Sequence, residues 1–192
     1  MNQLADSVIS NLKKIVGPEN VSDELPDRLA YTILGPTQAL PFETVSLKDR
    51  SLWPIAVVCP SNAKETSEIV KLANKEATPI LHRSRGTGFW ALTQVRKPRS
   101  IILDLRRMDK FKLDEKNVYI EAGPATIIDK LNEAINPKGY YFPFFPGSHR
   151  TSGIGGVVSI NTSGHIVDSY QGKPGNYVLG LEVVLPTGEI IN

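Results

Sequence analysis

The sequence predicts a domain of the α+β class, and three observations lead to that class. A strand–helix–strand unit is indicated between Ile55 and Arg83, where two short apolar runs flank a helical pattern. Several shorter strand patterns follow, and Pro186–Glu189 reads as the turn of a closing hairpin. Two glycine-rich loops, Arg83–Gly88 and Pro143–Gly164, interrupt these elements. Such loops let the backbone approach a ligand closely.

The sequence of the N-terminal part predicts mainly helical structure. An amphipathic helix starts the chain and ends at Gly17-Pro18, and its apolar face carries Leu4, Val8, Ile9, Leu12 and Ile15. A short helix is indicated around Asp23–Leu29, although Pro26 weakens the pattern. Gln38–Ser51 lacks periodicity and is interpreted as a linker. We therefore divide the chain into an N-terminal segment, residues 1–52, and a main domain, residues 53–192.

The main domain predicts short strands separated by two helices. Ser61 is expected to cap a helix that ends near Lys75, and Thr126 starts a second helix over Ile127–Ile135. The expected strands are Ile55–Cys59, Pro79–His82, Ile101–Leu105, Phe111–Leu113, Val118–Ala122, Val178–Leu185 and one beginning at Ile190. Since the last strand is cut short at Asn192, we expect that further chain or a second polypeptide completes the fold.

Composition excludes several classes of function. The chain of 192 residues is 41% hydrophobic and 22% charged, which is typical of a globular protein. Its formal net charge of +2 lacks the clustered basic excess of a nucleic-acid-binding protein. The single cysteine, Cys59, lies in an apolar run and excludes an internal disulfide. No apolar run approaches the ~18 residues of a membrane span, and the N-terminus does not resemble a signal peptide, so a cytoplasmic protein is expected.

The loop Arg83–Gly88 indicates a site for a diphosphate. It follows a predicted buried strand, and its glycines would let several N–H groups converge on an anion. Arg83 and Arg85 alternate, so only one is expected to face the ligand, and we favour Arg83; Thr87 could add a hydroxyl donor. The alternative is a solvated turn with two incidental arginines, because one glycine-rich loop is weak evidence.

The longer loop, Pro143–Gly164, has an apolar first half suited to a flat ring system. Its second half, from Gly153, could begin a short helix whose free N–H groups would favour a phosphate or a developing negative charge. Ser159 and Asn161 add polar groups. The alternative is a structural loop whose small residues allow tight packing. The sequence contains neither the G-x-G-x-x-G fingerprint nor a P-loop.

Other chemistry has little support. The three histidines, His82, His149 and His165, have no metal-ligand spacing, and we interpret them as surface or hydrogen-bonded residues. No serine stands in a G-x-S-x-G motif. The sequence therefore names no catalytic residue and no metal ligand.

Six segments in order carry a resemblance to a known family: PSNAKETSEIVKLANKEATPI, HRSRGTG, IILDLRRMDKF, IEAGPATIIDKLNEAINPKGYYFPFFPGS, GIGGVVSINTSG and YVLGLEVVLPTGEI. Together they resemble the p-cresol methylhydroxylase-type FAD-binding domain of the vanillyl-alcohol oxidase superfamily. Within it they resemble the branch of the glycolate oxidase FAD subunit and D-lactate dehydrogenase. The resemblance implies a two-subdomain α+β fold whose C-terminal part is missing here.

The resemblance implies that FAD is the ligand of both loops. The loop that matches Arg83–Gly88 binds the FAD pyrophosphate in that family, and the longer loop lies along the flavin. The expected cofactor-binding residues are Arg83, Ser84, Arg85, Gly86, Thr87, Gly88, Pro146, Gly147, Ser148, Gly153, Ile154, Gly155, Gly156, Ser159, Asn161 and Gly164. Relatives with covalently linked flavin have a histidine where this chain has Thr87, so noncovalent FAD is expected.

The chain departs from the family pattern at several positions. Ser84 replaces a glycine of the usual R-G-x-G-T, and Gly153 replaces the threonine of the usual T-I-G-G. Val157 and Ser159 replace an asparagine and an alanine. The loss of the threonine removes a side-chain donor, from which we expect weaker FAD binding.

Two hypotheses follow from the resemblance. The first is the FAD-binding portion of an oxidoreductase acting on a small 2-hydroxy acid such as glycolate or D-lactate, inactive as this chain alone. Its substrate-binding and acid/base groups would lie on sequence outside this chain or on a second chain. The second is a non-catalytic remnant or assembly subunit that keeps the FAD-domain fold and needs a partner.

Overall fold

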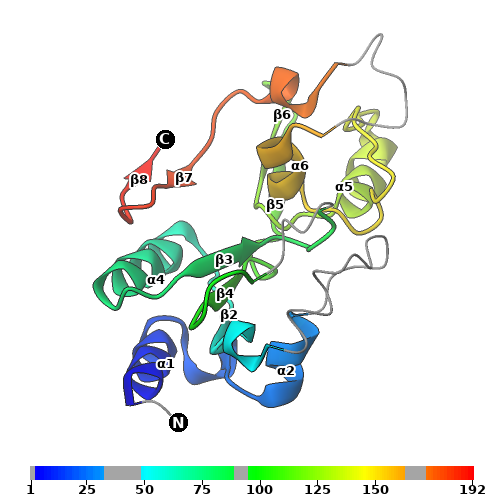
Figure 1. Cartoon of the computed structure of the whole chain (residues 1–192). Coiled ribbons are helices and arrows are strands. Elements are labelled where there is room, and N and C mark those ends of the chain that lie inside the picture. The colour runs from blue at the N-terminus through cyan, green and yellow to red at the C-terminus, as the bar shows by residue number, and fades with distance from the viewer. Residues whose placement is uncertain (1–2, 33–48, 89–94, 163–171) are drawn as a thin grey trace. The chain divides into compact units, whose positions relative to one another are not determined.

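The computed structural model describes residues 3–32, 49–88, 95–162 and 172–192 (Figure 1). The chain forms two compact units. Unit 1 consists of Met1–Arg83, Gly88–Asp104 and Glu182–Asn192, and unit 2 consists of Ser84–Thr87 and Leu105–Leu181. The short segment Ser84–Thr87 therefore packs with residues that follow it by some twenty positions or more.

Unit 1 is built on a four-stranded sheet in the order β1-β2-β4-β3. Its strands are β1 (Val21–Ser22), β2 (Ala56–Val58), β3 (Ile80–Arg83) and β4 (Ile101–Asp104). β1 is antiparallel to β2, while β2 and β3 each pair in parallel with β4. All residues of β2 and β4 are buried, as expected for central parallel strands covered on both faces.

The helices of unit 1 supply the apolar cover of this sheet. They are α1 (Gln3–Val16), α2 (Leu25–Ala30) and α4 (Ala63–Lys75), and α1 packs against α4 (Figure 1). Val8 and Leu12 of α1 and Ile69 of α4 are fully buried. The apolar face predicted for α1 is therefore confirmed at Val8 and Leu12, whereas Leu4 of that face is exposed. The hairpin β7 (Val183–Val184) and β8 (Ile190–Ile191) also belongs to this unit.

Unit 2 contains a second hairpin and two helices. β5 (Phe111–Asp114) pairs antiparallel with β6 (Tyr119–Ala122), and the helices are α5 (Ile128–Ile135) and α6 (Ile154–Ile160). Ile128, Phe144 and Val157 form a buried cluster that joins α5, the long loop and α6. The short helix expected in the second half of that loop is therefore confirmed as α6.

Short 3₁₀ turns connect these elements. They span Pro18–Asn20, Arg50–Leu52, Asn136–Lys138 and Pro174–Tyr177. Most of the segment interpreted as a linker, Gln38–Ser51, lies outside the described residues. Among the residues that are described, no helix has the length and apolarity needed to cross a membrane.

Three local expectations need correction. Asn62, not Ser61, caps α4, because its Oδ1 accepts from the Glu65 N–H at 2.9 Å. The Glu65 carboxylate accepts from the N–H of Ser61, the residue before the cap, at 2.7 Å. Pro26 stands in the first turn of α2, where its missing N–H costs no helical hydrogen bond. The strand expected over Val178–Leu185 is limited to Val183–Val184, because strand pairing requires a partner and residues 178–182 pair with no described strand.

Candidate functional site

A single backbone carbonyl joins the two glycine-rich loops within unit 2. The hydroxyl of Ser84 donates to the Pro124 oxygen at 2.7 Å, and the N–H of Gly155 donates to the same oxygen at 2.9 Å. A carbonyl oxygen has two lone pairs, so it can accept both hydrogen bonds. Pro124 lies in neither loop, yet it brings residues 84–87 and 153–156 together.

The side chain of Arg85 contacts other residues of its own chain. Its Nε donates to the Ala125 oxygen at 2.8 Å, and its Nη2 forms an ion pair with Asp109 Oδ2 at 3.3 Å. This guanidinium therefore fastens the first loop to the segment before α5. Which of the two arginines faces a ligand stays a prediction.

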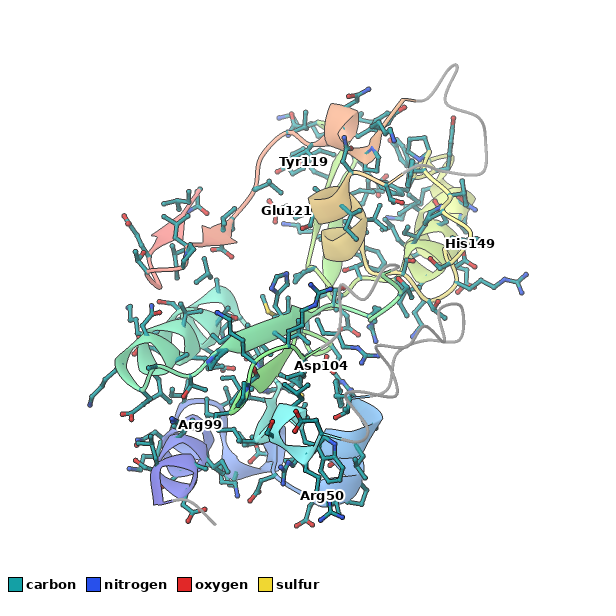
Figure 2. The ribbon with its side chains drawn as sticks, viewed as in Figure 1. Arg50, Arg99, Asp104, Tyr119, Glu121 and His149 are labelled. Carbon is teal, nitrogen blue, oxygen red and sulfur yellow. The ribbon has the colours of Figure 1, made fainter. Side chains whose placement is uncertain are left out.

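Arg83 ends strand β3 in unit 1 and lies in a partly buried polar cluster. Its guanidinium is 4.8 Å from the centre of the Tyr31 ring, and its strand partner is the buried Asp104, labelled in Figure 2. The Tyr31 hydroxyl donates to the Asp104 carboxylate. Burial lowers the pKa of Arg83, and the negative charge of Asp104 partly offsets that effect. Arg83 remains charged at neutral pH.

Three hydroxyl groups form a chain that bridges the loops. Thr87 Oγ1 lies 3.0 Å from Ser152 Oγ, which lies 2.6 Å from Ser148 Oγ. Ser152 is only 2% exposed, whereas Thr87 and Ser148 are half-buried. Three hydroxyl protons serve only two hydrogen bonds, so one proton has no acceptor among the described residues. The chain of hydroxyls can therefore donate to a ligand.

The first loop also offers backbone donors. The N–H groups of Arg85, Gly86 and Thr87 have no hydrogen-bond acceptor among the residues that the structure describes. Gly86 has a φ of 72°, which places it in the left-handed region that suits a glycine. Successive N–H groups around such a residue form a concavity that binds anions. Residues 85–87 therefore present a donor-rich surface.

The start of α6 differs from its expected role. The N–H of Ile154 donates to the Thr126 oxygen at 2.9 Å, and the N–H of Gly155 donates to Pro124. These two N–H groups are therefore not free to bind a phosphate. A Cβ at Gly155 would lie 2.5 Å from Pro124 Cβ, so this glycine is required for tight packing. Ile154 and Gly155 at the helix start therefore fasten the two loops, whereas the Gly156 N–H has no acceptor among the described residues.

The remaining predicted residues fall into different environments. Pro146 is buried, Gly147 and Ser159 are exposed, and a Cβ at Gly156 would lie in ordinary contact with Ser84 Cβ at 4.0 Å. Asn161 ends α6 with a φ of 50°, and its Oδ1 accepts from the Gly175 N–H at 3.0 Å. Gly88 belongs to unit 1, and Gly164 lies outside the described residues.

His149 lies in the longer loop and is hydrogen-bonded, as expected. His149 is labelled in Figure 2. Its Nδ1 lies 2.5 Å from Asp129 Oδ1, and its ring makes an edge contact with Phe145. Arg150 Nε is 4.0 Å from the other oxygen of Asp129. This cluster attaches the loop to the first turn of α5. Within the described residues, no three His, Cys, Asp or Glu side chains are grouped closely enough to hold a metal ion.

The sequence did not reveal Ser152 and Pro124 as parts of this site. Ser152 stands four residues after Ser148 in a polar segment, and this spacing does not single it out. Pro124 acts through its backbone carbonyl, and no side-chain pattern reports a carbonyl contact. Both residues therefore required the tertiary structure.

Comparison with known proteins assigns the class of this fold. Residues 54–192 match the family described as the FAD binding domain. The match covers most of the chain, so the protein belongs to this family. Its fold aligns with p-cresol methylhydroxylase over all of this chain and 35% of that protein, with a TM-score of 0.80 and 19% identity. An alkyldihydroxyacetonephosphate synthase aligns over 95% of this chain with a TM-score of 0.82 and 22% identity.

Two curated relatives share more of the sequence. The glycolate oxidase subunit GlcD of Bacillus subtilis is 30% identical over 98% of this chain and 37% of its own length. A D-lactate dehydrogenase of Archaeoglobus fulgidus is 35% identical over 74% of this chain and 32% of its own length. The chain thus spans about a third of the length of these relatives. The expected FAD-binding fold and family resemblance are confirmed.

The donors of unit 2 fit the diphosphate of FAD, the cofactor of this family. Three backbone N–H groups and one hydroxyl proton are available at residues 85–87 and 148–152. The nearby carboxylate of Asp109 is already paired with Arg85. The two ionised phosphate groups of the diphosphate accept hydrogen bonds but donate none, so a set of donors suits them.

Proposed function

We propose that this chain is the FAD-binding portion of a flavin-dependent oxidoreductase that acts on a small 2-hydroxy acid of the glycolate or D-lactate type. The observation that carries the proposal is the donor surface at residues 85–87, held against the longer loop through Pro124 and Ser152. Membership of the FAD binding domain family supports the cofactor. The names of the two relatives described above support the substrate class.

The residues of this chain would bind and orient the cofactor. The N–H groups of Arg85, Gly86 and Thr87 would hold the pyrophosphate, with the Thr87 hydroxyl oriented by Ser152. The remaining predicted residues of both loops, Arg83 and Gly156 among them, would line the cofactor. Bound FAD supplies the acceptor for a hydride equivalent from the α-carbon of the substrate. Thr87 lacks an imidazole that could be joined to the flavin, so binding would be noncovalent.

The substrate-facing groups belong, in this proposal, to polypeptide other than these 192 residues. A base and an anchor for the substrate carboxylate would come from a further segment or a second chain. Residues 53–192 would form the FAD-binding domain, and the working compartment would be the cytoplasm.

An absorbance spectrum of the purified protein tests the cofactor directly. After addition of FAD and removal of the excess, we expect flavin absorbance at one equivalent per chain and release of unmodified FAD on denaturation. A spectrum without flavin bands, together with no quenching of flavin fluorescence in a titration, would refute the proposal. Flavin that stays with the denatured protein would refute noncovalent binding.

The second candidate is a non-catalytic FAD-domain remnant or assembly subunit. The departures at Ser84, Gly153 and Val157 favour it. Dye-linked oxidation of D-lactate and glycolate distinguishes the two. Turnover by the FAD-loaded chain, alone or with the product of an adjacent reading frame, would exclude the remnant. FAD binding without turnover in either preparation would support it.

A further inference from the structure

Two departures from the family pattern lie directly against each other in unit 2. A Cβ at Gly153 would overlap the hydroxyl oxygen of Ser84, and it would also lie 2.7 Å from the Pro124 oxygen and 3.1 Å from Arg85 Cγ. Gly153 is buried and Ser84 is half-buried, so the space between them is limited. Position 153 can therefore have no side chain while position 84 has its hydroxyl in this place.

The hydroxyl of Ser84 also makes a specific contact. It donates to the Pro124 oxygen at 2.7 Å, the same oxygen that accepts from the Gly155 N–H. The donor surface at residues 85–87 begins immediately after Ser84. A hydrogen bond at this position therefore determines how the surface lies against the start of α6.

We propose that Ser84 is a positioning residue for the donor surface at residues 85–87. We also propose that Ser84 and Gly153 form a coupled pair, in which only one of the two positions has a side chain. The usual pattern has glycine first and threonine second, whereas this chain has serine first and glycine second. The serine hydroxyl stands where a side chain at position 153 would begin. In this view the two changes preserve the site, contrary to our expectation that loss of the threonine weakens FAD binding.

The inference rests on the proposed FAD site, and a double-mutant cycle tests it. The variants are Ser84→Gly, Gly153→Ala and the double variant, with Ser84→Ala to remove only the hydroxyl. FAD affinity is measured by quenching of flavin fluorescence, and thermal unfolding is measured without FAD. Gly180→Ala is the matched control, because a Cβ at Gly180 would meet nothing within 4 Å.

We expect Ser84→Ala to raise the Kd for FAD about fivefold, since one positioning hydrogen bond is lost. Gly153→Ala should weaken binding more strongly, because its Cβ would overlap the Ser84 hydroxyl. In the Ser84→Gly background, Gly153→Ala should raise the Kd for FAD less than it does in the unaltered chain, by a factor on the order of ten. Recovery remains partial because the Pro124 oxygen still lies 2.7 Å from the new Cβ.

Two outcomes would overturn the inference. One is equal damage by Gly153→Ala in both backgrounds, in the Kd and in the melting temperature. The other is a Ser84→Ala variant with the FAD affinity of the unaltered chain. If the unaltered chain binds no FAD, the proposed function fails, but melting temperatures of the four cycle members still test the coupling. A cycle that is additive in melting temperature would then overturn it.

Discussion

Ser152 connects the two loops, and its replacement by alanine provides a direct test of the site. Its hydroxyl lies between Thr87 Oγ1 at 3.0 Å and Ser148 Oγ at 2.6 Å, and the residue is 2% exposed. Ser152→Ala keeps the backbone and Cβ while removing the central member of this hydroxyl chain. The substitution therefore separates the polar contacts from the packing of the loop.

The size of the effect follows from the number of hydrogen bonds lost. Each neutral hydrogen bond contributes a net ~1 kcal/mol, so the loss of two lowers the free energy of unfolding by about 2 kcal/mol. Thr87 and Ser148 are half-buried, so water can satisfy part of their lost pairing. For FAD, the loss of orientation at Thr87 should cost about 1 kcal/mol, or roughly a fivefold higher Kd.

Urea unfolding and flavin fluorescence measure these two quantities. The matched control is Thr151→Ala, which removes a hydroxyl from the adjacent exposed residue. The Thr151 hydroxyl donates to the backbone oxygen of Ser148 at 3.2 Å. We expect the control to remain within ~0.5 kcal/mol of the unaltered chain. If Ser152→Ala matches Thr151→Ala in both measurements, the hydroxyl chain does not organise the site and the reasoning fails.

Three further substitutions test the fold around the site. Asn62→Ala removes the cap of α4 and should lower the free energy of unfolding by about 1 kcal/mol in urea; no change would contradict the cap. Gly123→Ala would place a Cβ against the Met108 oxygen and should cost about 1–3 kcal/mol, so a stable variant would contradict this packing. The Asn117 side chain and N–H lower the pKa of Asp114, so Asn117→Ala should raise that pKa in a carboxyl NMR titration. Because the pKa of Asp114 is lowered on folding, its contribution is present near neutral pH and is lost as the pH falls through the folded value; an unchanged pKa would refute the assignment.

Local periodicity was sufficient to predict most elements of the fold. Val8 and Leu12 recur at helical spacing and are fully buried in α1, and the continuous apolar run Ile101–Leu103 became a buried central strand. The pairing of strands was harder to predict from the sequence. Val178–Leu185 has a strand-like composition, but only Val183–Val184 has a partner among the described strands. A strand depends on hydrogen bonds to distant residues, and composition does not report those.

The sequence by itself determined the FAD-binding family and the two loops, because glycines, the Arg83–Gly88 segment and the order of the motifs are properties of the chain itself. The tertiary structure alone decided how the loops are joined. Pro124 contributes a backbone oxygen, Ser152 contributes a buried hydroxyl, and Ser84 occupies the space that Gly153 leaves free. These contacts depend on the approach of segments some forty to seventy residues apart, and only folding brings such segments together.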